Sequence, residues 1–185
     1  MAEKHLKIIC LMVSSLNGEI TSGENPNIYT WTSKEDQEHF FDQIEHAQLI
    51  LMGRKTYEQA KDMMKHQAGR LRMVFTTNPD EFGKETIPGQ LEFTSQTPEE
   101  AVARLSQKGY HEALLVGGSQ TNAAFLTAGL IDELWLTVEP LIFPGGTPLF
   151  AENATQTNWE LLSVEKLNGK GTLLLKYKIL LSSRT

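Results

Sequence analysis

Cysteine and clustered positive charge are both scarce in this sequence, and each scarcity excludes a class of protein. Cys10 is the single cysteine in 185 residues, so no internal disulfide can form, which fits a reducing cytoplasm. Its apolar neighbours predict a buried, unreactive thiol. No run of Lys or Arg exceeds two residues, and the formal net charge is −6. The chain therefore has no electrostatic footprint for nucleic acid, and we expect a cytoplasmic protein with no nucleic-acid partner.

Long apolar runs and metal-ligand motifs are also missing. Apolar stretches such as 49–52 are far shorter than the roughly 20 residues that span a bilayer, and residues 1–14 show no secretory cleavage site, so we expect no membrane association. The 5 histidines are scattered and lack the spacing of a metal site, so no bound metal is expected. The composition, 40% hydrophobic and 22% charged, is that of a folded protein. The length suits a single domain over residues 1–185.

Predicted strands and helices alternate along most of the chain, which indicates an α/β fold with a largely parallel sheet. Apolar runs predict strands at 6–14, 49–52, 72–77, 91–94, 113–116 and 133–139. Helices are predicted from Ser33 onward, over 54–64, from Thr97 to about Gly109, and over 119–128. Two final runs, 159–167 and 172–181, are joined by Asn168-Gly169 and predict an antiparallel hairpin at the edge of the sheet.

Two of these helices carry a capping signal at the first turn. Ser33 and Asp36 have the spacing of a variant capping box, in which each side chain bonds the other residue's backbone N–H. Thr97, followed by Pro98 and Glu100, has the full form of the same motif. A role as a helix cap is thus one prediction for the Asp36 carboxylate.

Three strand ends have sequences that favour phosphate binding. They are Gly-Arg-Lys-Thr at 53–56, Thr-Thr-Asn at 76–78 and Gly-Gly-Ser at 117–119. In open α/β sheets, ligands bind beyond the carboxyl ends of the parallel strands. Helix N-termini at these ends offer free backbone N–H groups to anions, and the Arg54 side chain adds a bidentate donor. Together the three ends suit a dinucleotide. Each glycine alone is also what a tight turn requires, and the GxGxxG fingerprint is absent.

Several motifs resemble those of one known superfamily. They are Ser-Leu-Asn-Gly-Glu-Ile at 15–20, Ser33-x-Glu35-Asp36, Ile-Leu-Met-Gly-Arg-Lys-Thr at 50–56, Val-Gly-Gly-Ser at 116–119, and the stretch 128–140 that continues to Pro-Gly-Gly-Thr-Pro-Leu-Phe at 144–150. On these residues the chain is identified as a member of the dihydrofolate reductase superfamily. Within it, the chain most resembles the C-terminal reductase domain of the bifunctional riboflavin-biosynthesis deaminase–reductase.

This resemblance implies a dihydrofolate-reductase-like three-layer sandwich, with a mixed, mostly parallel eight-stranded sheet, helices on both faces and a C-terminal antiparallel hairpin. It also implies an NADPH-dependent reductase. Residues 54–56 would meet the cofactor phosphates, residues 76–77 the adenosine ribose, and the double glycine the pyrophosphate or nicotinamide. The expected cofactor-binding residues are Gly18, Ile20, Gly53, Arg54, Lys55, Thr56, Thr76, Thr77, Gly117, Gly118, Ser119 and Gln120.

The substrate side of the implied site allows two interpretations. Trp31, Asp36 and Phe40 match the spacing of the folate enzyme, and Thr137 matches its threonine. Asp36 would then assist protonation beside the hydride acceptor, with Asn17, Trp31, Phe40 and Thr137 binding the substrate. In the alternative interpretation, Asp36 only completes the helix cap, and Trp31 and Phe40 are core side chains.

Three positions depart from the riboflavin-type pattern. Val116 stands where an acidic residue usually precedes the double glycine, Ile44 where an arginine often holds the ribose phosphate, and Asn17 where aspartate is typical. These departures bear on the phosphoribosyl-pyrimidine substrate and leave the expected fold and cofactor unchanged.

Hydride transfer from NADPH to a ribosylaminopyrimidine of riboflavin biosynthesis is the leading hypothesis for the function. A pterin such as dihydrofolate is the alternative small-molecule substrate, favoured by Asp36, Thr137 and the segment 53–56. A non-catalytic nucleotide-binding protein would use the same fold without the chemistry.

The C-terminal hairpin also bears on the oligomeric state. Its leucines offer more apolar surface than one edge strand needs; they are Leu173, Leu174, Leu175, Leu180 and Leu181. A homodimer and burial under the chain's own helices are the two alternatives for covering them.

Overall fold

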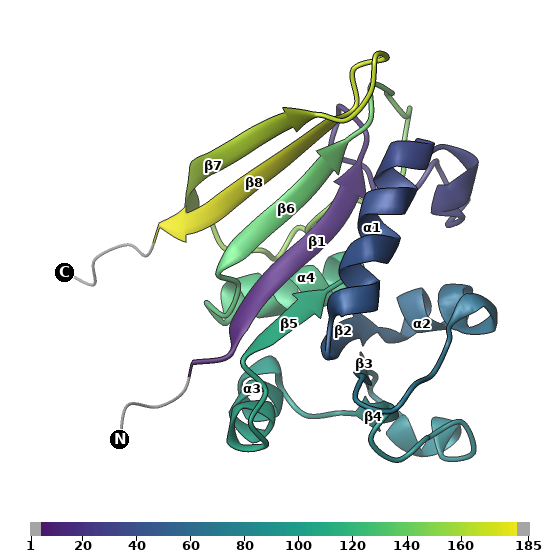
Figure 1. The fold of residues 1–185 in the computed structure, drawn as a ribbon, viewed down its shortest axis with the longest axis vertical. Helices are drawn as coiled ribbons and strands as arrows, with labels where there is room; N and C mark the ends of the chain where they lie inside the picture. The colour runs from purple at the N-terminus through teal and green to yellow at the C-terminus, as the bar shows by residue number, and fades with distance from the viewer. Residues whose placement is uncertain (1–4, 181–185) are drawn as a thin grey trace.

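The computed structural model describes residues 5–180, which form one eight-stranded mixed sheet (Figure 1). The strands lie in the order β4-β3-β2-β5-β1-β6-β8-β7. Their bounds are β1 Lys7–Ser14, β2 Leu49–Gly53, β3 Leu71–Phe75, β4 Leu91–Thr94, β5 Glu112–Leu115, β6 Glu133–Val138, β7 Asn158–Lys166 and β8 Leu173–Leu180.

The body of the sheet is parallel and its C-terminal edge is antiparallel. Every neighbouring pair from β4 to β6 is parallel, whereas β8 runs antiparallel to both β6 and β7. The predicted mixed, mostly parallel sheet with a C-terminal antiparallel hairpin is confirmed. The strand ends lie within two residues of the predicted bounds; the largest difference is at β3, which stops at Phe75 instead of Thr77.

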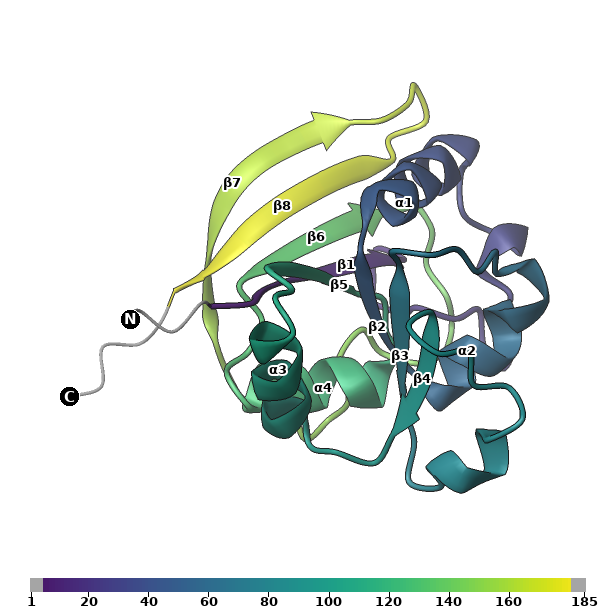
Figure 2. The same ribbon diagram turned by 60° about the horizontal axis from the view of Figure 1, so that its bottom comes forward.

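Four α-helices cover the two faces of the sheet in the described part of the chain. They are α1 Lys34–His46, α2 Arg54–Ala60, α3 Pro98–Gln107 and α4 Ser119–Thr127, with 3-10 turns η1 Ile28–Thr30, η2 Lys61–Met63 and η3 Pro79–Phe82. Figure 2 shows α3 and α4 against one face and α1 and α2 against the other. The predicted helix 54–64 thus ends at Ala60, and the η2 turn continues it.

Alternation along the strands explains the two apolar cores. Leu49 and Leu51 of β2 pack with side chains of α3 and α4, while Ile50 and Met52 pack on the opposite face with Tyr57 of α2. A strand that is buried on both faces needs an unbroken apolar run, which is what 49–52 supplies. Cys10 in β1 is also fully buried, and burial raises the pKa of its thiol.

The C-terminal hairpin exposes a different set of apolar side chains from the set predicted. The edge strand is β7, and β8 lies inside the sheet between β6 and β7. Leu174 of β8 is buried. The exposed apolar side chains of this region are Leu161, Leu162 and Val164 of β7 and Leu180 of β8. Of the leucines predicted to form the surplus apolar surface, Leu174 is therefore excluded, Leu173 and Leu175 are half-buried, Leu180 is exposed, and Leu181 lies outside the described residues. A homodimer stays a prediction.

No helix within residues 5–180 has the length and apolar character needed to cross a membrane.

Candidate active site

An open cleft of about 1840 Å³ lies at the carboxyl ends of the parallel strands and extends along α1. Its walls come from α1, from the β2–α2 and β5–α4 junctions, from the end of β3 and from the loops around residues 20–29 and 147–153. A site for one small ligand typically occupies about 300–1,000 Å³. The cleft therefore has room for two ligands side by side.

Most of the residues predicted to hold a cofactor line this cleft. Those that line it are Ile20, Gly53, Arg54, Lys55, Thr56, Thr76, Thr77, Gly118, Ser119 and Gln120. The β2 and β5 ends are joined directly, because the Gly53 backbone N–H donates to the Gly117 carbonyl at 2.7 Å. This bond brings together the two turns that the sequence predicts to bind phosphate, 53–56 and 117–119, which are more than 60 residues apart in the chain.

Gly18 and Gly117 do not line the cleft. The Gly18 carbonyl accepts a hydrogen bond from Leu149 N–H at 2.9 Å, so Gly18 fastens its loop to the segment after β6. Gly117 adopts φ +94°, and a Cβ there would lie 3.2 Å from the Met12 methyl group. Gly118 follows it through a cis peptide bond, and a Cβ on Gly118 would meet only the Thr56 hydroxyl, at 3.5 Å.

The start of α4 leaves polar groups without partners. Gly118 is the N-cap residue, and no side chain caps the first turn. The Ser119 hydroxyl oxygen is buried and has no hydrogen-bond partner among the described residues. Because the first N–H groups of a helix also lack partners within the helix, this turn offers donors to an anionic ligand, as the sequence predicts.

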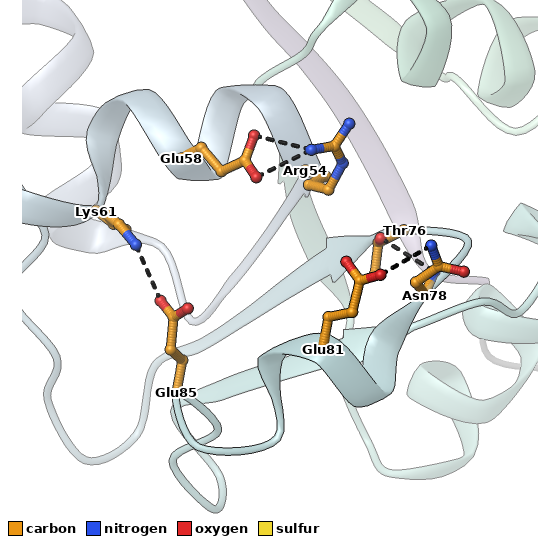
Figure 3. Close-up of polar contacts among 7 residues, drawn as sticks. All are labelled: Arg54, Glu58, Lys61, Thr76, Asn78, Glu81 and Glu85. Carbon is orange, nitrogen blue, oxygen red and sulfur yellow. Dashed lines mark hydrogen bonds and ion pairs between the residues drawn. The ribbon is translucent and has the colours of Figure 1, made fainter.

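The Arg54 guanidinium is already engaged by a neighbouring acid. Its Nη1 donates to both carboxylate oxygens of Glu58, at 3.0 and 3.1 Å (Figure 3). After the neighbouring strand β3, the Thr76 hydroxyl accepts from the Asn78 backbone N–H at 3.3 Å, and Asn78 donates in turn to Glu81. The Arg54 guanidinium that is predicted to bind phosphate is therefore also bonded to Glu58, and its Nε and Nη2 are the donors left for a ligand.

Asp36 lies in the first turn of α1, is 5% exposed and contributes to the wall of the cleft. Its backbone N–H donates to the Ser33 hydroxyl at 3.2 Å, which is one half of the predicted capping box. The other half is absent, because the Ser33 N–H donates to the Glu139 carboxylate at 2.7 Å instead. The prediction of a complete box at Ser33 is wrong. The Asp36 carboxyl is not used as a cap.

The surroundings of Asp36 favour its protonated form. Burial raises the pKa of Asp36 to about 6; the hydrogen bond from Thr137 partly opposes this, and the nearby Glu139 carboxylate adds to it. Thr137 is 1% exposed and does not line the cleft. A carboxyl group with a pKa near 6 can both hold and release a proton near neutral pH.

The remaining predicted substrate residues divide between the cleft and the surrounding loops. Phe40 lines the cleft beside Asp36. Trp31 does not, and its ring packs edge-on against Phe143 with centroids 5.2 Å apart. Asn17 also turns to Phe143, donating to its carbonyl at 2.8 Å and accepting from its N–H at 3.1 Å. Trp31 and Asn17 therefore hold the segment after β6 in place.

Two residues that the sequence interpretation missed belong to the site. Glu139 is 3% exposed and accepts from the Ser33 N–H and from the Thr172 hydroxyl, the latter at 2.7 Å. Arg72 of β3 is 4% exposed and lines the cleft. In the sequence, each is a charged residue in or directly after an apolar strand. Such a residue could have been recognised, because charged side chains are rarely buried unless they have a partner or a function.

Comparison with protein families gives a match over nearly the whole chain: the family model of the RibD C-terminal domain matches residues 6–173. Two similar proteins are uncharacterized proteins of Bacillus subtilis (strain 168). YwjB is 27% identical over 161 residues, 84% of this chain and 88% of that protein. YyaP is 24% identical over 173 residues, 86% of this chain and 88% of that protein.

Solved structures share the fold at low sequence identity. A putative riboflavin biosynthesis protein from Shewanella sp. PV-4 has a TM-score of 0.76 at 20% identity, over 94% of this chain and 99% of that one. A diaminohydroxyphosphoribosylaminopyrimidine deaminase/5-amino-6-(5-phosphoribosylamino)uracil reductase from Thermotoga maritima has a TM-score of 0.76 at 15% identity. The match covers 96% of this chain and 57% of that enzyme. The predicted dihydrofolate-reductase-like fold is confirmed.

Proposed function

The chain belongs to the RibD C-terminal domain family, and from this membership we propose that it is an NADPH-dependent reductase of a small heterocyclic substrate. One observation carries the proposal: a buried carboxyl, Asp36, and the uncapped start of α4 form walls of the same cleft. The first provides a group that can transfer a proton, and the second provides donors for an anionic cofactor. A reductase needs both within reach of one substrate.

The residues of the α4 side fit a dinucleotide. The partnerless Ser119 hydroxyl and the free N–H groups of the first turn of α4 would hold pyrophosphate oxygens, since these donors have no other acceptor in the described residues. Arg54, through Nε and Nη2, would bind the 2′-phosphate, with Lys55, Thr56, Thr76 and Thr77 beside it. When bound, NADPH supplies the hydride.

Asp36 is the proposed proton donor to the atom beside the one that is reduced. Its carboxyl lies against the Thr137 hydroxyl, which orients it, and burial keeps it protonated to about pH 6. Phe40 on the next turn of α1 forms the apolar wall for a flat ring. A positioned acid of this kind typically contributes about 100-fold or more to the rate.

The proposed substrate is a ribosylaminopyrimidine, as in 5-amino-6-(5-phosphoribosylamino)uracil reductases, because the family and the uracil reductase of similar fold point to that chemistry. A pterin is the second candidate. It is favoured by the Asp36 carboxyl in the cleft wall, which offers an acceptor to the amide and amino edge of such a ring and is hydrogen-bonded from behind by Thr137.

Oxidation of NADPH by the purified chain, followed by absorbance with each candidate substrate, tests the proposal. We expect turnover with the ribosylaminopyrimidine, and turnover lower by about 100-fold or more with the same substrate on Asp36→Asn. Turnover with dihydrofolate, and none with the ribosylaminopyrimidine, would show that the substrate is a pterin. Tight NADPH binding without turnover of either would assign the chain a nucleotide-binding role and contradict the proposed reaction.

A further inference from the structure

Arg72 occupies an unusual place in the wall of the cleft. It is the second residue of β3 and pairs with Ile50 of β2 on one side and Leu91 of β4 on the other. Ile50, Leu91 and Val74 form an apolar cluster on the sheet face that α1 and α2 cover. Arg72 therefore has an apolar residue on each neighbouring strand, and only 4% of its surface is exposed.

The Arg72 guanidinium has no partner within the described residues. Its Nη1 is buried without a hydrogen-bond acceptor, and none of the ion pairs in this part of the chain includes Arg72. The neighbouring Arg70 differs, because it donates to the backbone carbonyls of Glu45 and Ala47 at the end of α1. Arg70 is thus a structural clamp, and Arg72 is not.

The charges near Arg72 are of its own sign. Burial and the proximity of Arg70 both lower its pKa. Burial and, to a smaller extent, Arg72 lower the pKa of His66, whose Nδ1 is also buried without a partner. A guanidinium stays protonated in proteins. Burying it unpaired is costly, so this corner of the cleft has a strong preference for an anion.

The positions of Asp36 and Arg72 indicate the length of the ligand that the cleft can hold between them. Both Asp36 and Ile44 of α1 line the cleft, and eight helical residues correspond to about 12 Å along the axis. Ile44 packs against the cluster that contains Ile50, the β2 neighbour of Arg72. The cleft therefore runs along α1 from the carboxyl of Asp36 to the guanidinium of Arg72.

We propose that Arg72 binds an anionic group, a phosphate or a carboxylate, at the end of the substrate remote from Asp36. The guanidinium geometry suits either group because both accept two parallel N–H bonds from one arginine. That the occupant is the substrate rests on the proposed function, whereas the anion site itself rests only on Arg72 and its surroundings. The substrate is accordingly elongated, with a ring near Phe40 and an acid at the β3 end.

Binding of small aromatic acids to the full chain without cofactor tests this site. Phenyl phosphate and benzoate represent the two anions, and benzamide is the neutral probe of similar shape. Calorimetric titration is made on the wild type, on Arg72→Met, on Arg72→Lys and on Lys65→Met. Lys65 is the matched control because it is an exposed cation on the wall of the same cleft.

We expect at least one acid to bind the wild type about tenfold or more tightly than benzamide, which corresponds to one charge-assisted hydrogen bond. Arg72→Met should lose this preference, Arg72→Lys should keep part of it, and Lys65→Met should stay within about twofold. The acid that binds more tightly, phenyl phosphate or benzoate, shows whether the site prefers a phosphate or a carboxylate. Arg72→Met should melt at the same temperature as the wild type or higher, because it removes an unpaired buried charge.

Undiminished anion binding by Arg72→Met, or equal binding of benzamide and the acids, would overturn the proposal. So would an Arg72→Met chain that melts lower or does not fold, since a stabilising role for Arg72 would then account for its burial. The titration uses neither NADPH nor turnover. A chain that binds the acids through Arg72 but reduces nothing would therefore contradict the proposed reaction and leave the anion site standing.

Discussion

The backbone N–H of Ser33 donates to the carboxylate of Glu139 at 2.7 Å, across 106 residues of sequence. This bond satisfies the donor that Asp36 would otherwise bond as the acidic member of a capping box. Glu139 stands immediately after β6, and the Thr172 hydroxyl bonds its other oxygen. The end of β6 thus performs the capping, and the Asp36 carboxyl is left to face Thr137 and the cleft.

Asp36→Asn should separate catalysis from stability. We expect turnover to fall about 100-fold or more, since Asn keeps the shape and hydrogen bonds but cannot donate a proton in the same way. NADPH affinity should be unchanged. The comparison of turnover, cofactor titration and thermal melting on this one variant is decisive: a lower melting temperature with turnover held within a few-fold would assign Asp36 to the helix alone.

The stability of the same variant should depend on pH in a defined direction. The folded-state pKa of Asp36 is raised from 3.8 to about 6, so the stabilisation from its protonation is complete below about pH 4 and is lost as the pH rises through 6. A shift of this size corresponds to roughly 2–3 kcal/mol. Asp36→Asn should therefore gain stability relative to the wild type between pH 4 and 7, measured by urea unfolding. A constant difference across this range would contradict the raised pKa.

Activity should fall as the medium becomes alkaline. If Asp36 donates the proton, turnover declines about tenfold per pH unit once the pH exceeds its pKa of about 6. Glu139→Gln removes a negative charge that raises this pKa, so the decline should begin at lower pH. A pH–rate profile of the two proteins checks both statements, and superimposable profiles would show that Glu139 does not act on the titrating group.

Cofactor selectivity should depend on Arg54 and on its ion pair. We expect NADPH to bind more tightly than NADH, and Arg54→Ala to reduce NADPH affinity about tenfold or more, the effect of one charge-assisted bond. Glu58→Gln removes the negative charge of the carboxylate that accepts both Nη1 bonds of Arg54 and should strengthen NADPH binding. Fluorescence titration with both cofactors measures this, and equal wild-type affinities for the two would refute the assignment.

The two glycines after β5 should respond differently to a methyl group. Gly118→Ala should fold, because its Cβ meets only the Thr56 hydroxyl at 3.5 Å, yet lose cofactor binding where the ligand passes closest to the backbone. Gly117→Ala places a side chain at φ +94° and 3.2 Å from Met12, and should destabilise the fold by about 1–3 kcal/mol. Unchanged NADPH affinity in folded Gly118→Ala would place the cofactor elsewhere.

Features set by short-range interactions could be predicted from the sequence of this chain. The apolar run 49–52 predicts a strand buried on both faces, which β2 is. Thr97 and Glu100 form the reciprocal capping bonds that their spacing predicts, because both partners belong to one helical turn. The strand-end segments 53–56 and 117–119 likewise predict their place at the cleft, which all of their residues except Gly117 line, since the carboxyl ends of parallel strands share one edge of the sheet.

Tertiary structure decided the features whose partners are distant in sequence. Ser33 and Asp36 have the capping spacing, but Glu139 competes for the Ser33 N–H. Trp31 and Asn17 are bound by Phe143 and so leave the cleft wall. The burial of Arg72 depends on β2, β4 and α1 closing around it. Local sequence determines which conformations a segment prefers, whereas the accessibility, partners and pKa of a polar group depend on which distant elements pack against it.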